Sequence, residues 1–256
     1  YQLCKISRKK VKVCLGGDGA DELFAGYDTF KAMRYLNIAK TLKLTKLNPL
    51  VSNLISKIPT KYKNMNNKFK LSRFLKFSGN DLATANGQWL SPLSTNDISE
   101  LFNQPSHDDE VYSEAIDLWH KKKYLNNIDN SLEFYGKIFL QNQILVKTDR
   151  LSMLNSLEVR SPFLDLDFVD CARKIPSNLK LKGNISKYIL KKTYEKIFGK
   201  EFTYRKKMGF SAPISKWIIN NSDDFKIKSN FLNKKNYFIK SKLSDHFSYK
   251  SENRLF

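Results

Sequence analysis

Three acidic residues lie among four glycines near the start of the chain, in the run LGGDGADELFAGY at 15–27. An alternating apolar run at 11–15 precedes them and predicts a buried strand, and helical spacing follows from Ala20 to about Ala39. A glycine turn between a strand and a helix lets backbone N–H groups approach an anion, and carboxylates at the same turn favour a metal ion. On these residues alone, a tight turn whose aspartates cap the helix is an equal alternative.

A second stretch, residues 145–165, places charged and hydroxyl side chains beside leucine, methionine and phenylalanine. Thr148 and the aspartate after it predict the N-cap of a new helix, and Asp165 predicts the cap of the next helix. Such a helix-turn-helix favours half-buried ion pairs. The alternative is that Glu158, Arg160 and Asp165 only fix the turn.

A third stretch, residues 204–213, contains three adjacent cations at 205–207, followed by Gly209 and Pro213. Lysines on a glycine-containing loop can bind a polyphosphate as point charges. A solvated basic turn is the alternative interpretation.

The elements that must position these stretches are mainly helical. The chain has 256 residues, enough for one or two domains with a real core. One strand at 11–15 is followed almost entirely by helical patterns, including one closed by Gly199. We therefore predict a mostly α fold with a small residual α/β part. One strand cannot form a sheet, so further strands are either unrecognised or upstream of Tyr1.

Composition excludes several function classes. The net charge is +20, but the lysines are spread along the chain and accompany no nucleic-acid motif, so nucleic-acid binding is not favoured. No apolar run approaches the length of a membrane span, and the histidines have no zinc-ligand spacing. The three cysteines lie far apart, and we expect buried, reduced thiols in a reducing, cytoplasmic setting.

Together, the stretches resemble the synthetase domain of glutamine-hydrolysing asparagine synthetases. The resemblance runs from about residue 1 to about residue 220. It rests on several motifs in fixed order: GGDGADELFAGY at 16–27, KTDRLSM at 147–153, LEVRSPFLD at 157–165, residues 183–191, and RKKMGF at 205–210.

The resemblance implies an ATP- and Mg2+-dependent amidotransferase. Relatives adenylate a carboxylate, here expected to be aspartate, release pyrophosphate, and let ammonia attack the adenylate to form an amide such as asparagine. The ammonia comes from glutamine, which a separate N-terminal amidotransferase domain hydrolyses. The implied fold is the C-terminal portion of an adenine-nucleotide alpha-hydrolase-like (PP-loop) synthetase domain.

The resemblance also assigns roles to individual residues. Asp21 matches a carboxylate that holds Mg2+ on the pyrophosphate of ATP. Asp18 matches an acid near the adenylate carbonyl that orients or deprotonates the amine, where many relatives carry the longer Glu. Lys207 matches a lysine that faces the ATP phosphates and the oxyanion. The residues that it assigns to nucleotide binding are Gly17, Gly19, Lys147 and Lys207.

The chain departs from the family pattern in two ways. It contains no Ser-Gly-Gly-x-Asp-Ser loop, and it begins with Tyr1 rather than the catalytic cysteine of an amidotransferase domain. We therefore expect residues 1–256 to be the C-terminal part of one synthetase domain. Residues 1–40 would form the strand-loop-helix of its nucleotide-binding core and residues 41–256 a mainly helical remainder. We expect this part to be inactive by itself.

Other functions stay open at this point. A related ligase could form another amide or a lactam in polysaccharide or peptide biosynthesis. The charge of +20 also fits a non-catalytic basic module that binds nucleic acid. A helical domain that has lost activity is a further alternative.

Overall fold

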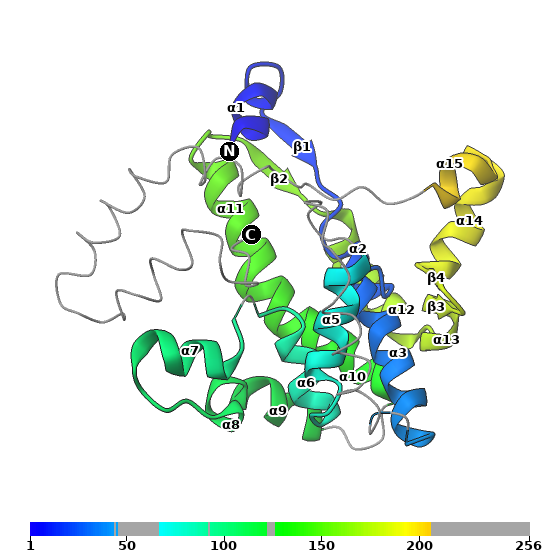
Figure 1. The fold of residues 1–256 in the computed structure, drawn as a ribbon. Helices are drawn as coiled ribbons and strands as arrows, with labels where there is room; N and C mark the ends of the chain where they lie inside the picture. Colours follow the sequence, from blue (N-terminus) through cyan, green and yellow to red (C-terminus); the bar gives the residue numbers. More distant parts are fainter. Residues whose placement is uncertain (44, 46–66, 92, 122–125, 206–256) are drawn as a thin grey trace. The chain divides into compact units, whose positions relative to one another are not determined.

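A computed structural model describes residues 1–43, 45, 67–91, 93–121 and 126–205 (Figure 1). The chain divides into two compact units. The first unit contains Tyr1–Lys43 and Asp117–Lys206, and the second contains Leu44–Ile116 and Lys207–Phe256. The described residues are mostly helical with a few short strands, which confirms the predicted predominance of helix.

A continuous helical run from Asn127 to Met153 crosses the first unit (Figure 1). The side chains of Phe30, Met33, Leu36 and Tyr135 are fully buried in this unit. Its elements, in chain order, are α1 (Gln2–Arg8), β1 (Val13–Leu15), α2 (Ala20–Leu23), α3 (Asp28–Thr41), α10 (Asn127–Phe134), η2 (Tyr135–Leu145), α11 (Val146–Met153), β2 (Glu158–Arg160), η3 (Pro162–Leu164), α12 (Leu166–Lys174), α13 (Ser177–Lys180), β3 (Leu181–Lys182), β4 (Ile185–Ser186), α14 (Tyr188–Phe198) and α15 (Lys200–Tyr204).

Strand β1 pairs in parallel with β2, so that the first and second motif stretches lie side by side. The Glu158 N–H donates to the Lys12 carbonyl at 2.9 Å, and the Gly16 N–H donates to the Arg160 carbonyl at 2.7 Å. Because a strand alternates, the backbone groups of the residues between Lys12 and Gly16 point alternately to β2 and to the opposite edge. Within the described part of the chain, no strand pairs with that opposite edge.

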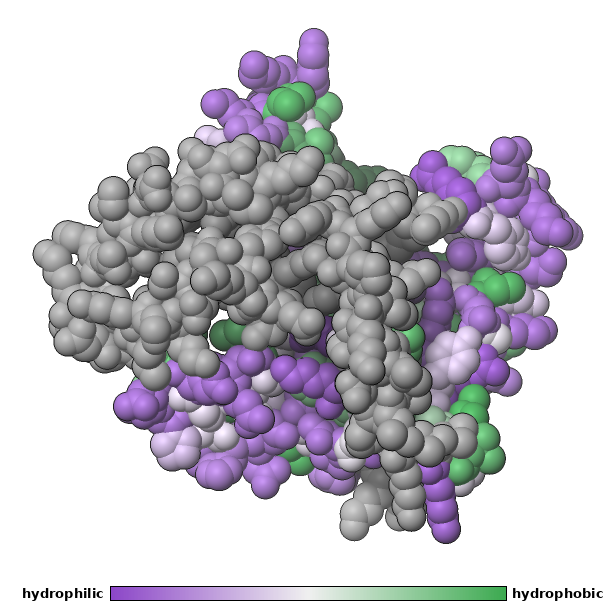
Figure 2. Space-filling model, in the orientation of Figure 1, coloured by the Kyte–Doolittle hydropathy of each residue, from purple (hydrophilic) through white to green (hydrophobic). Residues whose placement is uncertain are grey.

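The strand predicted at 11–15 is confirmed at Val13–Leu15, but its predicted burial is wrong. Val13 is 43% exposed and Leu15 is 73% exposed, and both backbones face the open edge of β1. Figure 2 shows hydrophobic residues beside hydrophilic ones at the α1 end of this unit.

The helix-turn-helix predicted around 145–165 is partly correct, because one helix ends at Met153 and another follows the Asp165 cap, but its first N-cap is wrong. No new helix begins at Thr148, because α11 continues η2 directly and Leu145 at the junction is itself helical. The segment after α11 forms β2, which was not predicted, before α12 begins at Leu166. Glu158 and Arg160 do form an ion pair at 2.7 Å, but both side chains are exposed rather than half-buried.

The predicted helix from Ala20 to Ala39 is divided into α2 and α3. Ala25 adopts a left-handed backbone with φ 53°, which ends the first helix. The Gly26 N–H donates to the Asp21 carbonyl at 2.8 Å and completes a compact turn. The acidic residues therefore lie on a short, separate helical turn.

Local signals predicted two other elements correctly. The Asp165 carboxylate accepts from the Phe168 N–H at 3.2 Å and caps α12. Gly199 ends α14 with φ 76°, a backbone conformation that favours glycine. One prediction about the thiols is wrong: Cys171 is exposed on α12, whereas Cys4 and Cys14 are half-buried.

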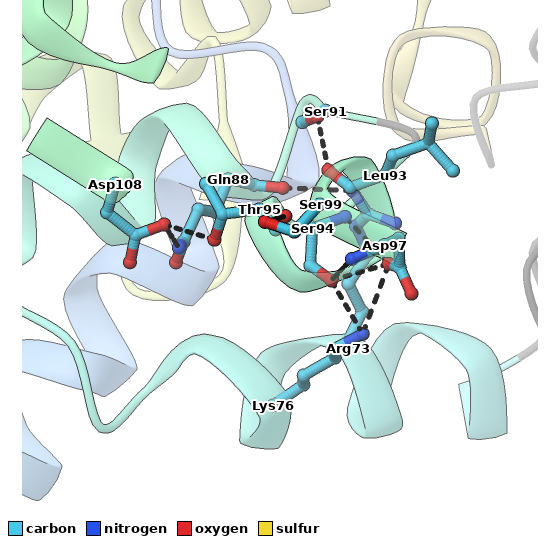
Figure 3. A network of polar contacts seen from close by, with 10 residues as sticks. All are labelled: Arg73, Lys76, Gln88, Ser91, Leu93, Ser94, Thr95, Asp97, Ser99 and Asp108. Carbon is cyan, nitrogen blue, oxygen red and sulfur yellow. Dashed lines mark hydrogen bonds and ion pairs between the residues drawn. The ribbon is translucent and has the colours of Figure 1, made fainter. Parts of the chain in front are cut away.

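The second unit contains a capping box at the start of α7 (Figure 3). The Asp97 N–H donates to Ser94 Oγ at 3.2 Å, and the Ser94 N–H donates to Asp97 Oδ2 at 2.8 Å. Nearby, Asp108 Oδ1 accepts from Gln88 Nε2 at 3.0 Å and from Thr95 Oγ1 at 2.6 Å. The helices of this unit are α5 (Asn67–Phe77), α6 (Leu82–Gln88), α7 (Thr95–Phe102), α8 (Asp108–Val111) and the start of α9 (Ser113–His120).

Replacing Ser94 with alanine should lower the free energy of unfolding by about 1 kcal/mol, because the N-terminal amides of α7 lose their side-chain acceptor. Urea unfolding followed by circular dichroism measures the effect. Ser113→Ala is the matched control, since the exposed Ser113 hydroxyl contacts only the Glu110 carbonyl at 3.1 Å. Equal losses for both variants would contradict a role for the capping box.

Candidate functional site

The acid turn, residues 16–26, contacts the long helical run through a side chain. Thr148 Oγ1 donates to Asp18 Oδ2 at 3.2 Å. Lys147 precedes Thr148 on α11 and is exposed. The structure therefore brings the second motif stretch to the carboxylate of the first.

Two glycines give the acid turn its close packing. Gly19 is buried with φ 90°, and a Cβ built on it would lie 2.4 Å from Leu164 Cδ2. Gly17 in contrast is exposed, and a Cβ there would meet nothing within 4 Å. Gly19 is also the N-cap of α2, and no side chain caps this helix. The alternative in which aspartates of the turn cap the helix is therefore wrong.

Asp21 forms an ion pair with a lysine from the third element of the site. Lys187 Nζ lies 2.9 Å from Asp21 Oδ1, and both side chains are about three-quarters buried. The Lys187 N–H donates to the Phe24 carbonyl at 3.0 Å, which fixes the start of α14 against the acid turn. Gly26 leaves room for the pair, because a Cβ there would lie 1.8 Å from Asp21 Oδ1.

Two further lysines, Lys31 and Lys191, lie close enough to interact with the charge of Lys187 or of each other. Burial lowers the pKa of Lys191, and the neighbouring charges of Lys31 and Lys187 lower it further. Lys31 also pairs with Asp28 at 3.2 Å on the first turn of α3. Two of the three ammonium groups beside the acid turn are therefore paired with carboxylates.

Comparison with known proteins identifies the family. The asparagine synthase family profile matches residues 1–254. This chain belongs to the asparagine synthase family. It is 27% identical over 231 residues to asparagine synthetase (glutamine-hydrolysing) 1 of Bacillus subtilis, covering 88% of this chain and 34% of that protein. No solved structure matches the chain significantly.

Further relatives have different names. Amidase chyE of Penicillium rubens is 25% identical over 237 residues, covering 83% of this chain and 34% of that protein. Asparagine synthetase (glutamine-hydrolysing) 3 of Bacillus subtilis is 33% identical over 95 residues, covering 34% of this chain and 16% of that protein. The chain spans about a third of the length of the first two relatives named here.

Most of the site residues predicted for this asparagine synthase chain lie among the described residues, and one lies outside them. Asp18, Asp21 and Gly19 lie on the acid turn, and Lys147 lies beside its hydrogen-bonded neighbour Thr148. Lys207 lies outside the described residues. Among the residues that the structure describes, no three acidic, histidine or cysteine side chains are placed to hold a metal ion. No helix in that part of the chain is long and apolar enough to cross a membrane.

The acid turn nevertheless suits Mg2+ that arrives with a nucleotide. Mg2+ keeps several waters and is often held by one or two carboxylates together with substrate phosphates. Asp21 offers one such carboxylate, which already binds a cation in the form of the Lys187 ammonium.

Sequence reasoning missed the contribution of Lys187. The surrounding segment 183–191 belongs to the motifs that resemble the family, but a single lysine among so many carries no signal of its own. The contact of Lys187 with Asp21 depends on the left-handed backbone of Lys187 itself, which has φ 54° and turns the chain at the start of α14. Pairing of segments far apart in the sequence brings the two residues together.

Proposed function

We propose that the whole protein containing this chain is an ATP-dependent amidotransferase. It adenylates a carboxylate, with aspartate as the first candidate, and transfers ammonia from glutamine to give an amide. The described chain supplies part of the nucleotide site within a PP-loop synthetase domain. Its partners in this function are ATP, Mg2+, the carboxylate, and an amidotransferase domain that releases ammonia.

The observation that carries this proposal is the convergence of three motif segments on one acid turn. Thr148 binds Asp18, Lys187 binds Asp21, and β2 pairs with β1 directly before the turn. Such an arrangement offers carboxylates for a metal and cations for phosphates within one unit. Membership of the asparagine synthase family supports amide formation as the reaction class.

The roles of the individual residues follow from their positions. Asp21 would hold Mg2+ on the pyrophosphate portion of ATP, and Asp18 would orient the amine that attacks the adenylate. Gly17 and Gly19 would border the nucleotide, with the open space above Gly17 available for a ligand. Lys147 and Lys207 would neutralise phosphate charge.

Release of pyrophosphate from ATP by the complete enzyme tests the reaction. A panel of carboxylic acids should include aspartate and acids that could form other amides or lactams. Release that depends on aspartate supports asparagine formation, and release with another acid assigns a different amide ligase. No acid-dependent release, from an enzyme shown to bind ATP, would contradict the proposed function.

Replacing Asp21 with asparagine should weaken Mg2+-dependent ATP binding by the complete enzyme by roughly 10- to 100-fold, because a neutral amide is a poor ligand for Mg2+. Calorimetric titration with and without Mg2+ measures the change. Asp28→Asn is the matched control, because Asp28 likewise lies in the first turn of a helix and pairs with a lysine. A loss of affinity shared by both variants would contradict the metal-binding role.

The 256-residue chain should bind ATP weakly by itself and should catalyse no turnover, because it lacks the Ser-Gly-Gly-x-Asp-Ser loop. The same calorimetric titration checks this expectation. Tight Mg2+-dependent binding by the chain alone would show that the described residues form a sufficient phosphate site.

A further inference from the structure

The long helical run of the first unit contains an unusual segment. Residues Tyr135–Leu145 form a π-helix of 11 residues between α10 and α11. π-Helices are rare and occur mostly as single turns, frequently at functional sites. A turn of π-helix contains more residues than a turn of α-helix. The segment therefore rotates the side chains that follow it around the helix axis, relative to their positions in a continuous α-helix. Those following residues include Lys147 and Thr148.

The first residue of the π-helix is held in an aromatic cluster. Tyr135 is fully buried, and its ring stacks on Tyr27 with centroids 5.1 Å apart. Phe30 and Phe139 also contact Tyr135, at 4.7 and 5.5 Å between centroids. The Tyr135 hydroxyl forms a hydrogen bond with Thr29 Oγ1. Ring packing and a hydrogen bond therefore fix the start of the π-helix against the chain that follows the acid turn.

A buried acid completes this connection. Glu22 is 3% exposed on α2, directly after Asp21, and the Tyr27 hydroxyl donates a hydrogen bond to its Oε1. Burial raises the pKa of Tyr27, and the hydrogen bond to Glu22 raises it further, so this hydroxyl keeps its proton as a donor. The Tyr27 side chain thus contacts both the acid turn and the π-helix.

We propose that Tyr27 and Glu22 are positioning residues that hold the π-helix in register, so that Thr148 meets Asp18 of the acid turn. The turn and the helical run are joined at two places: Tyr27 with Tyr135 at one end, and Asp18 with Thr148 at the other. Loss of the hydrogen bond from Tyr27 to Glu22 frees the Tyr27 ring to shift against Tyr135 and lets the π-helix rewind, which changes the direction of the residues on α11. The importance of this register for catalysis rests on the proposed function.

Amide hydrogen exchange of the full chain without nucleotide tests the proposal. In Tyr27→Phe, amides of residues 146–153 should exchange about tenfold faster, while those of α12 stay within about twofold. Glu22→Leu should speed the same amides, since it removes the acceptor of the same hydrogen bond, and the double variant should exchange no faster than either single variant. If Tyr27→Phe fails to fold, Thr29→Val serves instead, because it removes the partner of the Tyr135 hydroxyl.

Tyr35→Phe is the matched control. Its hydroxyl donates to Asn184 Oδ1 in the same unit, so the variant loses the same chemical group away from the π-helix. Exchange that rises only within residues 20–30, or rises equally in α12, would overturn the proposal. Because no nucleotide is present, the result is independent of whether the protein binds ATP.

Discussion

Gly19→Ala is expected to lower the free energy of unfolding by about 2–4 kcal/mol. The backbone at Gly19 has φ 90°, a conformation that L-residues with a Cβ rarely adopt. The new methyl group would also lie 2.4 Å from Leu164 Cδ2 and 2.9 Å from Leu164 Cγ. The free-energy costs of the strained backbone and of the overpacked methyl group therefore add together at Gly19. Urea unfolding of the chain measures the loss.

Gly17→Ala is the control within the same turn. Gly17 lacks the left-handed backbone, and its added methyl group would meet nothing within 4 Å. The control should change the free energy of unfolding by no more than about 0.5 kcal/mol. If both variants lost the same stability, the cost would reflect the turn in general rather than the packing of Gly19 against Leu164.

Lys207→Ala in the complete enzyme is expected to reduce aspartate-dependent release of pyrophosphate by roughly 100- to 1,000-fold. By resemblance to the family, this lysine is expected to face the ATP phosphates, where negative charge grows during adenylation. A fixed cation stabilises that charge most when water is excluded. The rate of pyrophosphate release under saturating ATP and aspartate measures the effect.

Lys206→Ala is the matched control for this prediction, because it removes the same charge at the neighbouring position. It should retain most of the activity if one specific ammonium matters rather than the net charge of +20. Full activity in Lys207→Ala would remove the assigned role. Equal loss in both variants would indicate a general electrostatic effect.

Local signals in the sequence predicted part of the fold. The cap at Asp165 and the stop at Gly199 were predictable because each depends on one residue and its near neighbours. Strand β2 could not be predicted, because its three residues are too few to show the alternation of apolar and polar side chains that indicates a strand. Its pairing with β1 joins distant segments, which no local pattern reports.

The candidate site shows the same division. The acids and glycines of the turn were apparent because their types and spacing are unusual together. The pairing of Asp21 with Lys187 required the folded chain, since both the position of α14 and the space at Gly26 create it. The π-helix was equally unpredictable, because its apolar residues have the spacing expected of an ordinary helix.

The open edge of β1 has a consequence for the protein in solution. Among the residues that the structure describes, none pairs with the backbone of Val13 and Leu15 along this edge, and both side chains are exposed and apolar. An edge of this kind is a template on which an extended segment of another molecule can add as the next strand. Concentrated solutions of the chain will therefore favour self-association unless a neighbouring polypeptide occupies that edge first.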